Sequence, residues 1–345
     1  MTVDADRPET EPASPPRRPL IRVIWNPEAG SKIGLPISRV DEPRMREALA
    51  RARLGDELMA SSSATEARTL AADAVSRGYD LVVAAGGDGT VSLVATELLG
   101  SDTVLGILPA GSVMDIGRSL GIPRDFEAAA DAIATGVVRR VDVGEVRGRP
   151  FFEGASVGMN ASMFEAVESF GRGDWPAMLR TIGVALRYRP ARMQIDLDTG
   201  QVETRALMVI VANGPYIGAG MTVAPAARLD DGKFDVRVFR HLSKPKLLRH
   251  LVSIAFGRYR YAPEVETYRS RFVRVDSAHP LPARADARDL GTTPIELFVR
   301  SAALAVVVPR GDGSQGVASD LGGPAAGTSS QTSGDDEASR PTSSP

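Results

Sequence analysis

The chain contains no cysteine among its 345 residues. This absence excludes disulfide bonds, thiolate zinc sites and a cysteine nucleophile. Histidine is also scarce, since His241, His250 and His279 are the only three and none stands at the spacing of a metal site. The chemistry of the protein must therefore depend on other side chains.

A strong charge of one sign and a long apolar run are missing too. The formal net charge is −2, so the composition gives no reason to expect nucleic acid as a partner. No apolar run approaches the ~20 residues that span a bilayer. The N-terminus is acidic and then proline-rich, without the apolar segment of a signal peptide. This composition is typical of a cytoplasmic enzyme, and 345 residues are enough for two domains.

Large apolar side chains are few at both ends of the chain. Residues 1–19 are mostly acidic residues, proline and arginine, and residues 310–345 are mostly Gly, Ser, Thr, Pro and Asp. Such segments cannot bury enough apolar surface to offset the entropy lost on ordering. We expect both segments to be disordered.

The most informative feature that is present is a glycine-rich turn. An apolar run, Leu81 to Ala85, is followed by Gly86-Gly87-Asp88-Gly89-Thr90 and then by a helical pattern from Val91 to Leu99. A buried strand, a glycine turn and a helix start place backbone N–H groups where an anion can bind. Asp88 would repel a phosphate, so its natural partner is a divalent cation, held directly or through water. The segment indicates a nucleotide–metal site, although a plain tight turn has the same pattern.

Two further strands end in similar turns. The strand at 20–25 runs into Asn26-Pro27-Glu28-Ala29-Gly30, and the strand at 104–109 runs into a turn that contains Gly111, Ser112 and Asp115. Ligands of open α/β sheets bind at the carboxyl ends of the strands. Three such turns at one edge favour a shared binding crevice over three unrelated turns.

The pattern of elements changes near residue 145. Alternating strands and helices predict a doubly wound, parallel α/β nucleotide-binding domain over 20–145. The later strands predict an antiparallel β-sandwich domain over 146–309, with helical insertions near 161–188 and 243–257. The expected strands are 20–25, 57–60, 80–85, 104–108, 139–147, 150–157, 192–198, 203–212, 234–239, 271–276, 294–299 and 303–308; the expected helices are 40–53, 64–77, 91–99 and 125–135.

In this order and spacing, the three turn motifs resemble the diacylglycerol kinase catalytic domain family. The motifs are NPEAG at 26–30, GGDGTV at 86–91 and LGILPAGSVMDIGR at 105–118. The family includes soluble bacterial diacylglycerol kinases and sphingosine and ceramide kinases, with NAD kinases as distant relatives. The resemblance continues through RVDVG at 140–144, FEGASVG at 152–158 and PAARLDDGKFDV at 225–236.

The resemblance implies an ATP-dependent lipid kinase with a nucleotide domain followed by a β-sandwich, whose last strands return toward the first domain. It also implies roles for individual residues. Ser61 matches a nucleotide-contacting position, although capping of the helix near Ala64 is an equally good interpretation of it. The implied ATP-binding residues are Asn26, Pro27, Gly30, Ser61, Gly86, Gly87, Asp88, Gly89, Thr90, Gly111 and Ser112.

The resemblance further implies two magnesium sites. Asp88, Asp115 and Asp142 match carboxylates that form a water-linked network around the catalytic Mg²⁺, where a cation would offset their mutual repulsion. A second, structural Mg²⁺ would be held by Asp231 and by the backbone carbonyls of Arg228 and Lys233. For Asp231 an ordinary turn remains an alternative.

The chain departs from the family at two places. Met114 stands where the family has asparagine, and the family's DGE motif is Asp286-Ala287-Arg288. The glutamate of DGE is the proposed base that takes the proton of the lipid hydroxyl, and arginine cannot act as a base. Asp286 or Asp289 could substitute, the reaction could run without a strong base, or activity could be lost.

The acceptor implied by the family is a lipid such as diacylglycerol. The apolar residues of the first helical insertion could line a lipid pocket, and a basic stretch from Arg240 to Arg271 could contact an anionic membrane surface, although ordinary core and a solvated face explain the same residues. The expected protein is cytoplasmic and peripherally membrane-associated, and a homodimer is left open. The alternative functions are a weakened pseudo-kinase that binds nucleotide or lipid and an NAD kinase-like enzyme, which would need an Asn-Glu pair after the glycine turn that this chain lacks.

Overall fold

The structure is a computed structural model of the 345-residue chain. It describes residues 18–29, 31–32, 35–36, 40–55, 57–159, 176, 189–218, 220–240 and 265–311. Most of the two ends expected to be disordered, and nearly all of both helical insertions, therefore lie outside the described residues.

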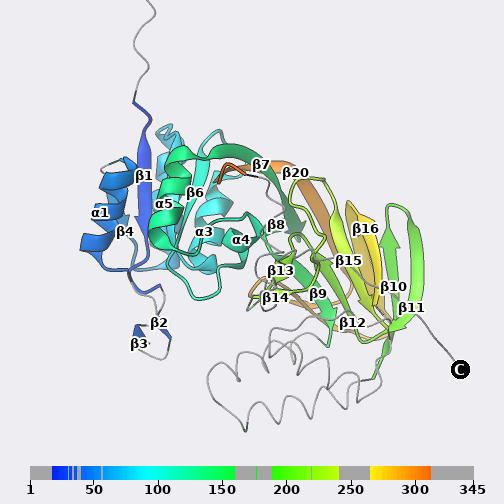
Figure 1. The fold of residues 1–345 in the computed structure, drawn as a ribbon. Coiled ribbons are helices and arrows are strands. Elements are labelled where there is room, and N and C mark those ends of the chain that lie inside the picture. The colour runs from blue at the N-terminus through cyan, green and yellow to red at the C-terminus, as the bar shows by residue number, and fades with distance from the viewer. Residues whose placement is uncertain are drawn as a thin grey trace, which may run out of the picture.

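The N-terminal half is built on four parallel strands (Figure 1). They lie in the order β4 (Glu57–Ala60), β1 (Ile21–Trp25), β5 (Leu81–Gly86) and β6 (Val104–Pro109). Successive residues of β5 point to opposite faces of the sheet, and Val82 to Gly86 are all buried. Both faces of this sheet are therefore covered, which explains the continuous apolar sequence of the strand.

Helices cover these faces in two pairs. The first pair is α1 (Glu42–Ala52) with α5 (Phe126–Thr135), and the second is α2 (Ala64–Ser76) with α3 (Asp88–Leu98). The N-cap side chains of α1, α2 and α5 are Asp41, Ser63 and Asp125, and each accepts a hydrogen bond from the third residue that follows it. Together, strands and helices form the predicted doubly wound α/β half.

Two long strands connect this half to the sandwich. β7 (Val137–Val146) and β20 (Ile295–Val308) pair with each other, and Figure 1 shows them running from the helical half into the second half. β20 also pairs in parallel with β6 through Val306 and Leu105, and it pairs antiparallel with β17 (Phe272–Ser277). β17 is followed in the sheet by β10 (Ala191–Leu197) and β11 (Gly200–Ala206). One sheet of ten strands therefore spans both halves.

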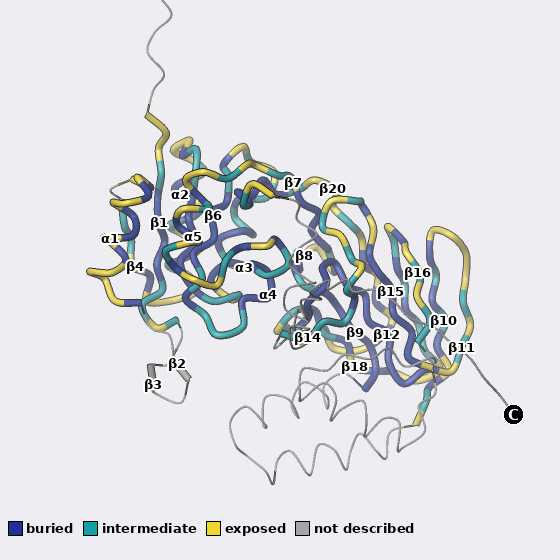
Figure 2. The backbone as a smooth tube through the Cα atoms, in the orientation of Figure 1, coloured by how far each residue is buried: buried dark blue, intermediate teal, exposed yellow. Residues whose placement is uncertain are grey.

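A second sheet of six strands packs against the C-terminal part of the first sheet. Its order is β16 (Val265–Ser270), β15 (Phe234–Phe239), β12 (Met208–Ala212), β9 (Gly154–Gly158), β18 (Pro282–Ala285) and β19 (Arg288–Thr292). Between the sheets, the rings of Phe151 and Phe234 stack with centroids 5.6 Å apart, and this interior is buried in Figure 2. Gly144 gives Phe151 room, because a Cβ there would lie 2.1 Å from its ring. The predicted sandwich is confirmed.

The boundaries of several elements differ from the sequence expectation. The expected strand at 150–157 is two strands, β8 (Arg149–Phe151) and β9, because Asp286 binds the backbone N–H groups of residues 152–154. The expected strand at 203–212 is also two, since the chain passes from the first sheet to the second at Leu207. The last two expected strands are one strand with a bulge around Ala302. The short elements not expected are α4 (Asp115–Ser119), β2 (Ser31–Lys32), β3 (Leu35–Pro36), β13 (Tyr216–Ile217), β14 (Met221–Thr222), β16, β18 and β19.

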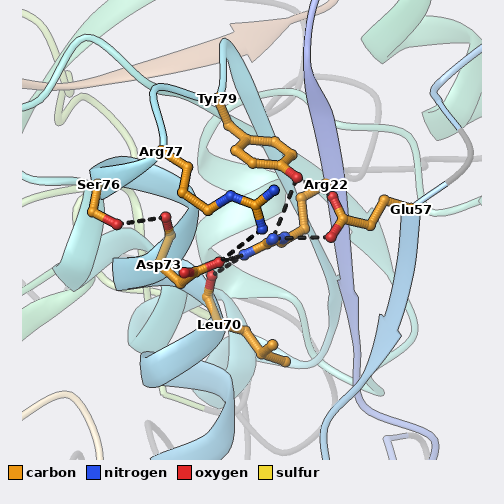
Figure 3. A network of polar contacts seen from close by, with 7 residues as sticks. All are labelled: Arg22, Glu57, Leu70, Asp73, Ser76, Arg77 and Tyr79. Carbon is orange, nitrogen blue, oxygen red and sulfur yellow. Dashed lines mark hydrogen bonds and ion pairs between the residues drawn. The ribbon is translucent and has the colours of Figure 1, made fainter.

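One arginine is buried near the N-terminal end of β1. The side chain of Arg22 is 2% exposed and makes ion pairs with Glu57 at 2.9 Å and with Asp73 at 2.6 Å. It also bonds the carbonyl oxygen of Leu70 and the hydroxyl of Tyr79, as Figure 3 shows. This network, the Arg22 cluster, joins β1 and β4 to α2. Among the described residues, no helix has both the length and the apolar character needed to cross a membrane.

Candidate functional site

A cavity of about 720 Å³ lies between the α/β half and the sandwich half. One wall comes from α2, α3 and α4, and the other comes from β8, β19 and the turns beside them. Both halves therefore contribute to one space. The lining residues are Arg68, Asp88, Gly89, Ser92, Leu93, Thr96, Ile116, Gly148, Arg149, Pro150, Glu153, Asp286, Ala287 and Arg288.

The glycine turn after β5 forms the start of α3. Asp88 is the first residue of this helix, and its Oδ1 accepts a hydrogen bond of 3.0 Å from the backbone N–H of Ile116 in α4. A Cβ at Gly86 would lie 2.5 Å from Thr90, and a Cβ at Gly111 would lie 2.5 Å from the Cα of Gly87. Glycine is therefore required at both positions. Gly86 makes room for the side chain of Thr90, and Gly111 lets the turns after β5 and β6 pack backbone against backbone.

The turn after β1 joins the same group. Asn26 Nδ2 donates a hydrogen bond of 3.3 Å to the hydroxyl of Thr90, and Asn26 Oδ1 accepts one of 3.0 Å from the N–H of Glu28. Pro27 and Ser112 are half-buried in the turns after β1 and β6. The structure thus brings together three strand-end turns. Gly30 lies outside the described residues.

Ser61 is placed differently from the other predicted nucleotide residues. It is 4% exposed, and its hydroxyl donates to the carbonyl oxygen of Trp25 at 3.3 Å. The N-cap of α2 is Ser63, whose hydroxyl accepts from the N–H of Glu66. The capping interpretation of Ser61 is therefore wrong, since its hydroxyl instead ties the end of β4 to the end of β1.

Asp115 is fully buried at the start of α4. Its Oδ2 accepts a hydrogen bond of 3.0 Å from the N–H of Gly220, and its Oδ1 lies 3.6 Å from the guanidinium of Arg118. No described residue gives that buried Oδ1 a hydrogen bond. Burial raises the pKa of Asp115 to about 6, the Gly220 hydrogen bond opposes the rise, and the charge of Asp88 adds to it.

The sandwich half contributes two more carboxylates. Asp286 stands at the β18–β19 turn with φ 47° and accepts hydrogen bonds from the N–H groups of Phe152, Glu153 and Gly154 at 2.9, 3.0 and 3.2 Å. Burial raises the pKa of Asp286, and these three N–H groups oppose the rise. Asp286 therefore holds the turn on which Glu153 sits.

Glu153 is the cavity residue that the sequence reasoning missed. It is half-buried, and its Oε2 accepts a hydrogen bond of 2.9 Å from the N–H of Gly218. Burial raises the pKa of Glu153 well above its ordinary value, and the charges of Asp286, Asp115 and Asp88 raise it further. The available signal was an acid placed directly before Gly154 in an otherwise apolar strand pattern.

The two residues that depart from the family motifs lie in different surroundings. Arg288 lines the cavity, donates a hydrogen bond to the carbonyl oxygen of Pro150, and lowers the pKa of Asp286 by its charge. Met114 is 2% exposed, with a backbone φ of 59°, and a Cβ on Gly111 would lie 3.1 Å from its Sδ. Met114 therefore packs under the turn after β6 and does not line the cavity.

The Asp142 carboxylate accepts hydrogen bonds from two backbone N–H groups. Its Oδ2 accepts from the N–H of Gly232 at 2.6 Å, and its Oδ1 accepts from the N–H of Ala302 at 2.8 Å. Both oxygens thus hold the backbone where β7, β20 and the 230–233 turn meet. The water-linked network of Asp142 with Asp88 and Asp115 stays a prediction.

The residues predicted for the second magnesium site are also engaged in other contacts. Asp231 Oδ1 accepts from the N–H of Lys233 at 3.0 Å, and Oδ2 forms an ion pair with Arg269. Arg228 pairs with Asp230 at 3.0 Å. These contacts involve side chains and the Lys233 N–H, whereas the predicted ligands include the backbone carbonyls of Arg228 and Lys233, so the second magnesium site stays a prediction. Among the described residues, no three acidic or histidine side chains form a metal-binding group.

Asp88 at the cavity wall and the neighbouring buried Asp115 do fit a magnesium ion. Asp88 and Asp115 offer hard oxygen ligands, and one buried oxygen of Asp115 accepts no hydrogen bond from the described residues. The mutual repulsion that contributes to the raised pKa of Asp115 would be relieved by a cation.

Comparisons with known proteins agree with this architecture. Residues 20–146 match the diacylglycerol kinase catalytic domain, and residues 155–308 match the YegS C-terminal NAD kinase beta sandwich-like domain. A diacylglycerol kinase of Mycobacterium tuberculosis is 32% identical over 259 residues, covering 72% of this chain and 82% of that protein. A diacylglycerol kinase of Bacillus subtilis is 26% identical over 295 residues, covering 84% and 96%.

A solved structure shows the same fold. The crystal structure of a diacylglycerol kinase from Bacillus anthracis superposes with a TM-score of 0.64 at 19% identity, covering 84% of this chain and 97% of that one. The resemblance inferred from the turn motifs is confirmed over both halves of the chain. This protein is a kinase of the diacylglycerol kinase family.

Proposed function

We propose that the protein is an ATP-dependent lipid kinase that transfers the γ-phosphoryl group of ATP to the hydroxyl of diacylglycerol or a related lipid. One observation carries this proposal. The glycine turn and Asp88 of the α/β half line the same cavity as Glu153 and Asp286 of the sandwich half. A phosphate donor held by one half would thus face an acceptor held by the other.

The nucleotide would bind at the three strand-end turns. The first N–H groups of α3, an 11-residue helix, have no partners within the helix and can donate to phosphate oxygens. Asn26 and Thr90, already joined by a hydrogen bond, would fix the turn beside them. Positioning of this kind accounts for most of the catalysis of phosphoryl transfer.

Asp88 and Asp115 would hold the magnesium ion, directly or through water. When bound, the ion supplies charge that offsets the negative phosphates. The hydrogen bond from Ile116 N–H to Asp88 and the one from Gly220 N–H to Asp115 orient these carboxylates. Ile116 and Gly220 therefore act through the two carboxylates, by restricting their orientation.

Lipid binding would involve the first helical insertion and the basic stretch from Arg240 to Arg271. The apolar residues of the first helical insertion, which are predicted to line a lipid pocket, lie outside the described residues. In the predicted basic stretch, Arg240 pairs with Glu266 at 2.8 Å and Arg269 pairs with Asp231 and Asp235. These two arginines are therefore partly neutralised by neighbouring carboxylates. Contact with an anionic membrane surface remains part of the proposal, and comparing sedimentation with anionic and neutral vesicles tests it.

The deciding experiment is direct phosphoryl transfer. Purified protein, Mg²⁺ and ATP labelled at the γ-phosphate are incubated with mixed micelles of diacylglycerol, monoacylglycerol, a sphingoid base or ceramide, and NAD is added as a water-soluble acceptor. We expect label in a chloroform-soluble product, and none with the Asp88→Asn variant. Label on NAD alone would overturn the proposal in favour of the NAD kinase-like alternative.

One feature of the cavity also supports a second candidate function. Arg288 in place of the expected base favours a pseudo-kinase that binds nucleotide without transferring phosphate. Calorimetric titration with ATP and Mg²⁺ distinguishes the two functions. Binding of ATP without transfer to any acceptor would establish the pseudo-kinase.

A further inference from the structure

The chain needs a proton acceptor that its DGE-like motif does not supply. When a lipid hydroxyl attacks a phosphorus atom, its proton must leave, and the guanidinium of Arg288 cannot take it. Three carboxylates line the described part of the cavity: Asp88, Glu153 and Asp286. The base is to be sought among these three.

Asp88 and Asp286 already have other roles. Asp88 stands in the glycine turn beside the phosphate-binding N–H groups, where a cation is expected. Asp286 accepts three backbone hydrogen bonds and so maintains the 152–154 turn. A proton on Asp286 would weaken those contacts, because they favour the ionised carboxylate. Both residues are therefore poor candidates for the proton acceptor.

Glu153 has the position and the support that a base requires. Its backbone is fixed twice, since its N–H donates to Asp286 and its carbonyl oxygen accepts from the N–H of Asn213 at 3.0 Å. Its carboxylate is oriented by the N–H of Gly218 at 2.9 Å. The side chain is thus held at the cavity wall by groups of the sandwich half, opposite the nucleotide turns.

We propose that Glu153 is the general base of this kinase and replaces the glutamate that Arg288 displaces. The inference rests on the proposed lipid kinase function. In the transfer step the lipid oxygen bonds to the γ-phosphorus, the bond from that phosphorus to the β–γ bridging oxygen breaks, ADP leaves, and the hydroxyl proton passes to Glu153. Arg288 is a positioning residue that holds the Pro150 carbonyl, and its charge opposes the rise in the pKa of Asp286.

The charges around Glu153 suit this role. Asp286 faces it from the β18–β19 turn, Asp88 from α3 and Asp115 from α4, while Arg149 of β8 and Arg288 of β19 line the same cavity. Burial raises the pKa of Glu153, and the charges of the three carboxylates raise it further. A carboxylate with a raised pKa is a stronger base once it is ionised. Activity should therefore fall as the pH is lowered through that pKa.

The test compares the wild-type protein with Glu153→Gln, Glu153→Asp and the double variant Glu153→Gln with Arg288→Glu. Glu203→Gln, an exposed residue of β11, is the matched control. For each protein the measurements are kcat and KM with the lipid accepted by the wild type, ATP affinity by calorimetry, the melting temperature, and kcat across pH 5–9.

We expect Glu153→Gln to lower kcat by about 10²–10⁴-fold, with unchanged ATP affinity and no acid limb in its pH profile. Glu153→Asp should retain part of the activity, with the acid limb displaced. The double variant should recover at least tenfold over Glu153→Gln, because its carboxylate stands at the DGE position. Glu203→Gln should match the wild type.

The outcomes separate the two proposals. If the wild-type protein phosphorylates no lipid, the proposed lipid kinase function is refuted, and so is the proposed role of Glu153. An active wild type whose Glu153→Gln variant keeps kcat within about threefold, or loses kcat while keeping the wild-type pH profile, refutes only the role of Glu153. If Glu153→Gln melts early, an undisplaced acid limb in Glu153→Asp likewise refutes that role.

Discussion

Two groups of charged residues lie toward opposite ends of the parallel sheet, and they differ in how their negative charge is balanced. In the Arg22 cluster, one buried guanidinium lies between two carboxylates (Figure 3). Burial tends to raise the pKa of Glu57, but the hydrogen bonds from Arg22 and Tyr79 outweigh it and the pKa falls. The hydrogen bond from Arg22 also lowers the pKa of Asp73. Charge there is balanced within the protein.

In the cavity group, negative charge exceeds the positive charge that surrounds it. Asp88, Asp115, Glu153 and Asp286 act on one another as like charges, and the pKa values of Asp115, Glu153 and Asp286 are raised. Arg118 and Arg288 offset this only in part. A folded protein keeps such a group at a cost in stability, so its balance must come from a ligand or from a proton. The comparison separates charge that holds the fold from charge that serves a reaction.

The largest effect should follow from Asp88→Asn, which removes a charge from the cavity group. We expect turnover to fall by at least about 10³-fold, equal to about 4 kcal/mol of transition-state stabilisation. The fold should remain intact, since the amide oxygen can still accept from Ile116 N–H and one repulsion is removed. The measurements are lipid kinase turnover and the melting temperature, and turnover equal to that of the wild type would remove Asp88 from the site.

The second effect concerns the Arg22 cluster. Arg22→Met leaves Glu57 and Asp73 without their cation, and breaking a buried ion pair costs about 3 kcal/mol of unfolding free energy. That figure is at the lower end of the usual range because the two acids are 33% and 47% exposed and can be hydrated. Urea denaturation measures the loss, and kcat at a temperature where the variant is folded should be unchanged. A variant of full stability, or one with impaired kcat, would break the distinction between the two groups.

The pH dependence of this loss has a definite sign. Folded-state pKa values below the ordinary ones mean that Glu57 and Asp73 stabilise the protein above about pH 4–5, and that this stabilisation disappears as the pH falls through the lowered values. The stability difference between wild type and Arg22→Met should therefore shrink as the pH is lowered from 6 to 3.

Much of the fold and the convergence of the glycine turns could be predicted from the sequence. The apolar run before Gly86 and the glycines at Gly87 and Gly111 predicted the convergence of strand-end turns, because local backbone needs determine such motifs. The α/β half and the sandwich followed from the change in periodicity. The long strand β20, which joins both halves in one sheet, was predicted only as two shorter strands, since its bulge at Ala302 interrupts the pattern.

The assignment of individual carboxylates could not be read in the same way. Asp142 and Asp115 follow similar sequence signals, yet one binds backbone N–H groups at the junction of β7 and β20 and the other lies beside Asp88. Glu153 enters the cavity only because Asp286, 133 positions further along, holds its turn open. Such long-range contacts leave no local pattern in a single sequence.

The third effect contrasts Asp115 with the Arg22 cluster. Asn in Asp115→Asn mimics the protonated carboxyl, whose pKa is raised to about 6 in the folded protein. A raised carboxyl pKa has the opposite effect on stability from the lowered values of Glu57 and Asp73. Ionised Asp115 lowers the free energy of unfolding, fully above about pH 6, and this loss disappears below the pKa of the unfolded state. Urea denaturation in chelator should show the variant gaining roughly 2 kcal/mol on the wild type between pH 4 and pH 7.5. A gap that is constant over this range would contradict the assignment, and added Mg²⁺ should narrow the gap.

The smallest effect should come from an ion pair that belongs to neither group. Arg46 and Glu42 are one turn apart on α1, 2.7 Å from each other, with side chains 57% and 52% exposed. Water screens such a pair, and its loss costs only about 0.3 kcal/mol. Arg46→Met thus makes the same chemical change as Arg22→Met at an exposed site, and its melting temperature should stay within about 1 °C of the wild type. Equal losses from both variants would show that burial does not distinguish the Arg22 cluster, whereas a tenfold difference in free energy would assign a large share of the stability of this half to the buried guanidinium of Arg22.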